Sequence, residues 1–194
     1  MPELDLHDAA DQMARLLEEV PDDALDRPTP SDMPLAQLID HIGDFASGFI
    51  AVAQKDIGDR TNPSPPTGDL EAGWRKRITG DLGALADAWD APDAWEGMTS
   101  AGGLDLPGAL AGRVALDELV VHRWDIARAI GQPYDCDAAV LQEIEATIRQ
   151  FRGDNQGEIP GLFGPVVPVP DGAPLIDQVI GLTGRDPGWT PPTP

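Results

Sequence analysis

The chain has 194 residues, a mass of 20.6 kDa and 41% hydrophobic residues, which is enough for the core of one domain. Its net charge of −21 and pI near 4.1 argue against binding to nucleic acid, which requires clustered Lys and Arg. No run of about eighteen apolar residues occurs, so we expect no membrane span. The acidic amino terminus does not resemble a secretory signal. The single cysteine, Cys136, excludes an internal disulfide and a thiolate metal cluster, and it fits a cytoplasmic protein.

Apolar residues recur at helical spacing three times in the first half of the chain. The first pattern spans Leu4–Val20 and is ended by a proline. The second begins at Pro34, because proline is well tolerated at the first helical position, and fades by Lys55. The third spans Leu70–Trp89, after a Gly/Pro-rich surface loop over residues 56–68. We therefore predict three helices, with His41 on the edge of the apolar face of the second.

The second half begins with a segment that has no helical period, Trp95–Leu106, for which we predict a loop or a short extended excursion. A fourth helix should run from Pro107 or Gly108 to Ile130, with Gly131 as its carboxyl-terminal stop. Asp137 is suited to cap a fifth helix.

Prolines and glycines dominate the segment Arg152–Ala173, which cannot be a central strand and should wrap over the bundle. A short closing helix is expected over Pro174–Thr183, followed by a loose tail. The prediction is an all-α four-helix bundle with a carboxyl-terminal cover. Its expected parts are residues 1–155, the bundle with a fifth helix, and residues 156–194, the cover and tail.

The fourth predicted helix carries a polar stripe on an apolar background. Glu118, His122 and Asp125 follow one another at spacings of four and three residues, which places them on one face. Burying such a stripe is costly unless something compensates it, and a metal ion held by Glu118, His122 and a third ligand would do so. Of the other two histidines, His41 is the better candidate, because His7 lies in the first turn of a terminal helix. The alternative is that His122 and Glu118 form only a structural pair.

Asp125 is the residue to which we assign a catalytic role, as a group that orients a metal ligand or a bound water. The competing interpretation is that Asp125 bonds within its own helix, for example to Arg128. The spacing of residues does not decide between the two.

Three segments resemble one known superfamily, in the family's order along the chain. They are TPSDMPLAQLIDH (29–41), DELVVHRWDIARAIG (117–131) and FGPVVPVPDGAPLIDQVIGLTGRDP (163–187). These segments resemble actinobacterial metal-binding proteins of the DinB/YfiT-like superfamily, which includes mycothiol-dependent maleylpyruvate isomerases. The chain departs from the family pattern at Ser31 and Met33, where members often carry Cys and Trp.

The resemblance implies a four-helix bundle whose divalent ion, zinc or else nickel, is held by His41, Glu118 and His122. It also implies a small-molecule substrate, mycothiol as a co-substrate and, by analogy, a homodimer. The leading hypothesis is a metal-dependent enzyme that uses a low-molecular-weight thiol for S-transfer or isomerisation. The alternatives are a metal-dependent hydrolase and a non-catalytic module that binds a metal or a small ligand.

Overall fold

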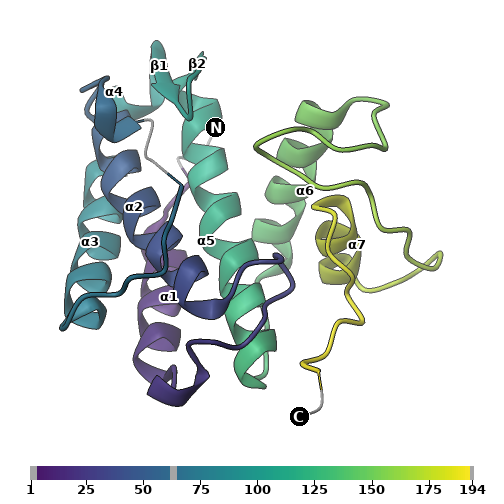
Figure 1. The fold of residues 1–194 in the computed structure, drawn as a ribbon. Coiled ribbons are helices and arrows are strands. Elements are labelled where there is room, and N and C mark those ends of the chain that lie inside the picture. The colour runs from purple at the N-terminus through teal and green to yellow at the C-terminus, as the bar shows by residue number, and fades with distance from the viewer. Residues whose placement is uncertain (1–3, 62–64, 193–194) are drawn as a thin grey trace.

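Four helices pack side by side in the computed structural model, which describes residues 4–61 and 65–192. They are α1 (His7–Glu19), α2 (Leu35–Ala53), α3 (Trp74–Trp89) and α5 (Gly108–Ile130). Helices α1 and α2 each pack against both α3 and α5, which closes the bundle (Figure 1). The core between them is made of fully buried aliphatic residues contributed by all four helices. The predicted all-α four-helix bundle is confirmed.

Backbone chemistry explains where several helices begin and end. Pro34 is the residue that precedes α2, so the helix begins at Leu35, one residue later than predicted. Gly131 ends α5 in the left-handed conformation, with φ of 74°, which costs a glycine little. Asp137 caps α6 (Ala138–Arg152), because its side chain accepts a hydrogen bond from the backbone N–H of Ala139 at 2.7 Å.

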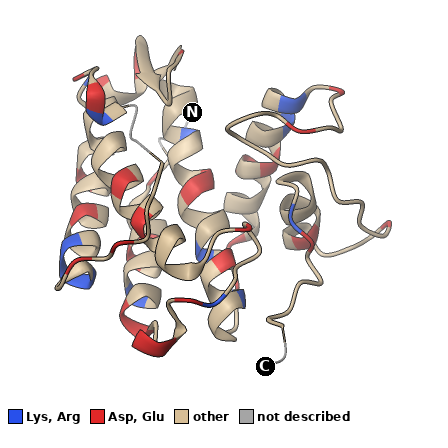
Figure 2. Ribbon diagram, in the orientation of Figure 1, with Lys and Arg blue, Asp and Glu red and all other residues tan. Residues whose placement is uncertain are grey.

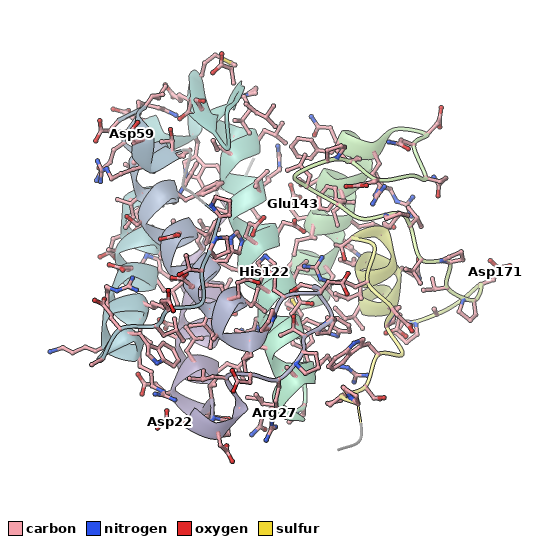
Figure 3. The ribbon with its side chains drawn as sticks, in the orientation of Figure 1. Asp22, Arg27, Asp59, His122, Glu143 and Asp171 are labelled. Carbon is pink, nitrogen blue, oxygen red and sulfur yellow. The ribbon has the colours of Figure 1, made fainter. Side chains whose placement is uncertain are left out.

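Short elements close one end of the bundle, at the top of Figure 1. The segment for which we expected a loop or a short extended excursion forms an antiparallel hairpin of β1 (Met98–Ala101) and β2 (Leu104–Pro107). Before it lies α4 (Pro92–Trp95), a single helical turn that the sequence analysis missed. A 3-10 turn, η2 (Asp59–Thr61), follows α2 at this end, and another, η1 (Asp22–Ala24), follows α1 at the opposite end (Figure 3).

The carboxyl-terminal part lies along the other side of α5 (Figure 1). Helix α6 packs on α5, and α7 (Leu175–Leu182) packs on α6. The segment between them, residues 153–174, contains neither helix nor strand, as predicted. Arg152 holds this segment in place, since its guanidinium donates to the backbone carbonyls of Leu182, Asn155, Gly157 and Gly164. The division of the chain at residue 155 stays a prediction.

Acidic residues are spread over all parts of the molecule, and the few basic ones lie among them (Figure 2). Within the described part of the chain, none of the helices has the length and apolar character needed to cross a membrane.

Candidate metal centre

Two neighbouring helices of the bundle, α2 and α5, bring three predicted side chains together. His41 comes from α2, and Glu118 and His122 lie one turn apart on α5. The Oε2 atom of Glu118 lies 3.3 Å from Nε2 of His41 and 2.9 Å from Nε2 of His122. Figure 3 shows His122 in the middle of the molecule. We call these three residues the triad.

A carboxylate, that of Asp125, contacts the second ring nitrogen of His122. Its Nδ1 atom lies 2.9 Å from Oδ2 of Asp125, which is fully buried. Asp125 also accepts three contacts of 2.8–3.0 Å from the guanidinium of Arg185, whose side chain is only 12% exposed. The residues form a chain from Arg185 through Asp125 to His122, which fixes the orientation of the imidazole ring. Asp125 therefore bonds a triad histidine, and Arg128 instead donates to the carbonyl of Trp189 at 2.6 Å.

His122 and Glu118 require a positive charge between them, either a proton or a metal ion. Because Asp125 accepts the Nδ1–H, a neutral His122 points the lone pair of Nε2 at a carboxylate oxygen. Burial opposes protonation of His122, but the charge of Glu118 and the hydrogen bonds to Asp125 and Glu118 raise the pKa of the imidazole to about 9. Burial would raise the pKa of Glu118, but His122 and His41 hold it well below its usual range. The site thus attracts a cation, either a proton or a metal ion.

The triad also fits a divalent ion by its donor atoms and their spacing. Two imidazole nitrogens and one carboxylate oxygen are ligands typical of catalytic zinc, which keeps a further position open. Ligand atoms about 2.0–2.1 Å from a tetrahedral ion are roughly 3.3 Å apart. The three donor atoms lie within 4.8 Å of one another, so small rotations of the side chains would place an ion between them.

Asp117 is a second buried carboxyl group beside the triad, and the sequence analysis did not single it out. Its side chain is almost fully buried, and Oδ1 has no hydrogen-bond partner among the described residues. Burial, followed by the charge of Glu118, raises the pKa of Asp117 to about 7. Burial therefore favours the neutral form of Asp117, and its carboxyl adds negative charge beside the triad only where it is ionised.

Arg185 is the site residue that the prediction of a loose tail overlooked. The segment after α7 does not hang free, because Arg185 pairs with Asp125 and the carbonyls of Pro187 and Trp189 accept from Arg128. The prediction of a loose tail is therefore wrong for this part. The only sequence signal for Arg185 was its place within the third family-like segment, 163–187.

His7 lies far from the triad, at the start of α1. Its Nε2 atom is 3.0 Å from Asp90 and 4.0 Å from Asp87, and all three side chains are substantially exposed. This second group of candidate ligands is exposed to water, where carboxylates are well solvated. His7 therefore serves as a control histidine.

The triad lies between two hollows that share His41 and Glu118. The polar pocket, of about 310 Å³, is bounded by residues 30–33, the turn around Gly161 and the segment 183–185, with His122 at its base. The apolar chamber, of about 140 Å³, shares only these two lining residues with the polar pocket. It is lined, besides His41 and Glu118, by Asp44, Phe45, Gly48, Phe49, Val52, Arg60, Thr61 and Gly102.

Comparison with known proteins places this geometry in a family. Residues 6–127, which include the triad, match the family described as the mycothiol maleylpyruvate isomerase N-terminal domain. The chain is also 30% identical over 186 residues to the uncharacterized protein Rv0738 of Mycobacterium tuberculosis (strain H37Rv) and to its counterpart MT0763 in strain CDC 1551. Each alignment covers 91% of this chain and 93% of the relative.

A solved structure supports the same assignment at the level of the fold. The crystal structure of a histidine-to-alanine mutant of the mycothiol-dependent maleylpyruvate isomerase superposes with a TM-score of 0.61 at 16% identity. The match covers 79% of this chain and 70% of the other. At that identity the likeness concerns the fold alone. On the strength of the sequence match over most of the bundle, the chain belongs to the mycothiol maleylpyruvate isomerase N-terminal domain family.

Proposed function

We propose that this protein binds a divalent metal ion, zinc in the first place, through His41, Glu118 and His122. We further propose that it is an enzyme that uses a low-molecular-weight thiol such as mycothiol in S-transfer or isomerisation of a small electrophile. The observation that carries the proposal is the convergence of three ligand atoms, 2.9 and 3.3 Å apart, where two cavities meet. Family membership supports the thiol, because the family and the solved relative are both named for mycothiol.

The side chains around the triad have separate tasks in this proposal. When bound, a divalent ion would supply positive charge that favours the thiolate form of a thiol at neutral pH. Asp125 keeps the Nδ1 proton on His122, so that Nε2 presents its lone pair to the ion. Arg185 balances the charge of Asp125 and holds its carboxylate in place. Both are positioning residues, because they act through His122.

The polar pocket suits the body of such a thiol. Ser31, Asp32 and Thr183 contribute hydroxyl and carboxylate groups to its lining, and the segment 183–185 after α7 forms part of its wall. A thiol whose body lies in this pocket would direct its sulfur toward His122 and Glu118. The thiolate would then add to an electrophilic carbon: a C–S bond forms, and the electron pair displaced from that carbon is taken up by the substrate's own π system.

Elemental analysis and thiol titration test the proposal. Wild type purified from cells should carry about one equivalent of a divalent metal per chain, and His41→Ala and His122→Ala should carry little. His7→Ala is the matched control and should match wild type. Isothermal titration should then show mycothiol binding to the metal-loaded wild type, whereas its S-methyl derivative binds weakly.

Two results would contradict the proposal in different ways. Metal content that survives His41→Ala would show that Glu118 and His122 form only a structural pair. Turnover of esters or amides by the metal-loaded protein without any thiol would instead favour the hydrolase alternative.

A further inference from the structure

The apolar chamber beside the triad is built by the close approach of two segments. A Cβ atom on Gly48 would lie 2.8 Å from the backbone oxygen of Arg60, so a glycine is needed there for η2 to lie directly on α2. The hairpin is joined to the same region, because the N–H of Gly102 donates to the carbonyl of Thr61 at 2.8 Å. Thr99 adds a second tie, from its hydroxyl to the carbonyl of Val52 at 2.9 Å. These contacts hold the chamber open in a fixed shape.

The lining and size of the chamber indicate what it can hold. Most of the surface that faces the chamber is hydrocarbon, from Phe45, Phe49 and Val52. Its volume of about 140 Å³ is close to that of engineered apolar cavities of about 150 Å³, which bind benzene. A group of about six carbons would therefore fill it. Apolar pockets of this kind gain affinity from the hydrocarbon surface that they remove from water.

The charges at the edge of the chamber disfavour an anion of high charge. Among the described residues of the lining, Arg60 is the only Lys or Arg, and it is paired with Asp56, which precedes η2. Asp44 adds a carboxylate that has no ion pair within the described part of the chain, and Glu118 belongs to the triad. An ion bound at the triad could receive one carboxylate of a dicarboxylate, but the second would lie near Asp44, where Arg60 is already paired.

We propose that the apolar chamber binds the hydrocarbon part of the electrophile, a neutral or monoanionic molecule with an apolar group of about six carbons. This inference rests on the proposed function, since it places the electrophile on one side of the triad and the thiol in the polar pocket on the other. His41 and Glu118 line both hollows, so the reacting carbon and the sulfur meet at the triad. The chain thus selects its substrate by apolar shape.

Amide chemical shifts of the full-length, metal-free chain test the chamber directly. Toluene, as the apolar probe, should shift the amides of Gly48, Val52 and Thr61, whereas maleate at the same concentration should leave them unchanged. Phe49→Trp should weaken toluene binding about tenfold, since it takes up space in the chamber. Phe49→Ala should enlarge the chamber, so that naphthalene binds as well. Phe151→Ala, a change of the same kind on α6, should match wild type.

The inference is overturned if toluene leaves these amides unshifted, or if maleate binds there more tightly than toluene and loses this binding in Arg60→Ala. Because the titration contains neither metal nor thiol, such a failure leaves the proposed function standing when metal and mycothiol still bind. Conversely, toluene binding in a chain that takes up no metal would refute the proposed function, and with it the assignment of the occupant as an electrophile.

Discussion

Replacing Asp125 by Asn tests whether the carboxylate that contacts Nδ1 of His122 determines the affinity of the triad for a metal ion. Asn keeps the shape of Asp, but it offers one acceptor oxygen and one NH₂ donor. Arg185 can only donate, so the oxygen of Asn must face it, and the NH₂ must face Nδ1 of His122. Nδ1 then becomes an acceptor, and the proton moves to Nε2. That proton occupies the atom through which His122 would bind the ion.

The size of the effect follows from the contacts that are lost. Removing a partner behind a metal-binding histidine weakens metal affinity by about 10–100-fold, or about 1.4–2.7 kcal/mol, and the reversed tautomer places Asp125→Asn near the upper end. Arg185 also loses its ion-pair partner while only 12% exposed, which should lower the free energy of unfolding by about 3 kcal/mol. Zinc competition with a chromophoric chelator at pH 7 measures the first effect, and urea unfolding measures the second.

The control for this experiment is Asp81→Asn, which alters another Asp–Arg pair, on α3, where Arg77 lies 3.6 Å away. It should leave zinc affinity unchanged and alter stability by less than about 1 kcal/mol. A folded Asp125→Asn variant whose zinc affinity stays within about twofold of wild type would refute the role given to Asp125. Nitrogen shifts of the His122 ring report the tautomer independently.

Three further predictions concern packing, reactivity and the carboxyl-terminal cover. Gly112→Ala should lower the free energy of unfolding by about 1–3 kcal/mol, because the added Cβ would lie 2.3 Å from the ring of Trp95. Gly80→Ala is the control: no described atom outside its own helix lies within 4 Å of the added Cβ, so it should raise the melting temperature slightly. Burial raises the pKa of the Cys136 thiol above its ordinary value of 9.0, so iodoacetamide should alkylate it slowly at pH 7 and faster as the pH rises past 9. Mass spectrometry follows this reaction; rapid alkylation at pH 7 would contradict it. Arg152→Met should expose residues 153–174 to limited proteolysis and cost about 3 kcal/mol, since four backbone carbonyls lose a charged donor. Unchanged protease resistance would count against this role.

The long helices could be predicted because their signals are local. The apolar period within each helix, Gly131 as a stop and Asp137 as a cap act over a few residues, and the structure follows them. The single turn α4 and the hairpin were harder, because elements of four residues have too few positions to show a period. Their place depends on contacts with α2 and α5 that no local pattern records.

The residues of the candidate site likewise differ in how far the sequence could predict them. Glu118 and His122 are one turn apart on one helix, so their proximity follows from spacing alone. His41 could be named because few histidines exist and because the family resemblance pointed to it. Arg185 lies 60 residues from Asp125, in a segment rich in Gly and Pro that has no period, so the pattern predicted a loose tail where the fold makes a buried ion pair.

The residues that line the polar pocket come from two separate parts of the chain, and this affects how relatives of the chain can diverge. The triad lies within residues 6–127, the part that matches the family, whereas Arg185 and much of the wall of the polar pocket come from the segment beyond it. A descendant chain can therefore exchange or reshape that segment while the bundle and triad persist. Family membership then forecasts the three triad residues better than it forecasts which molecule the polar pocket accepts.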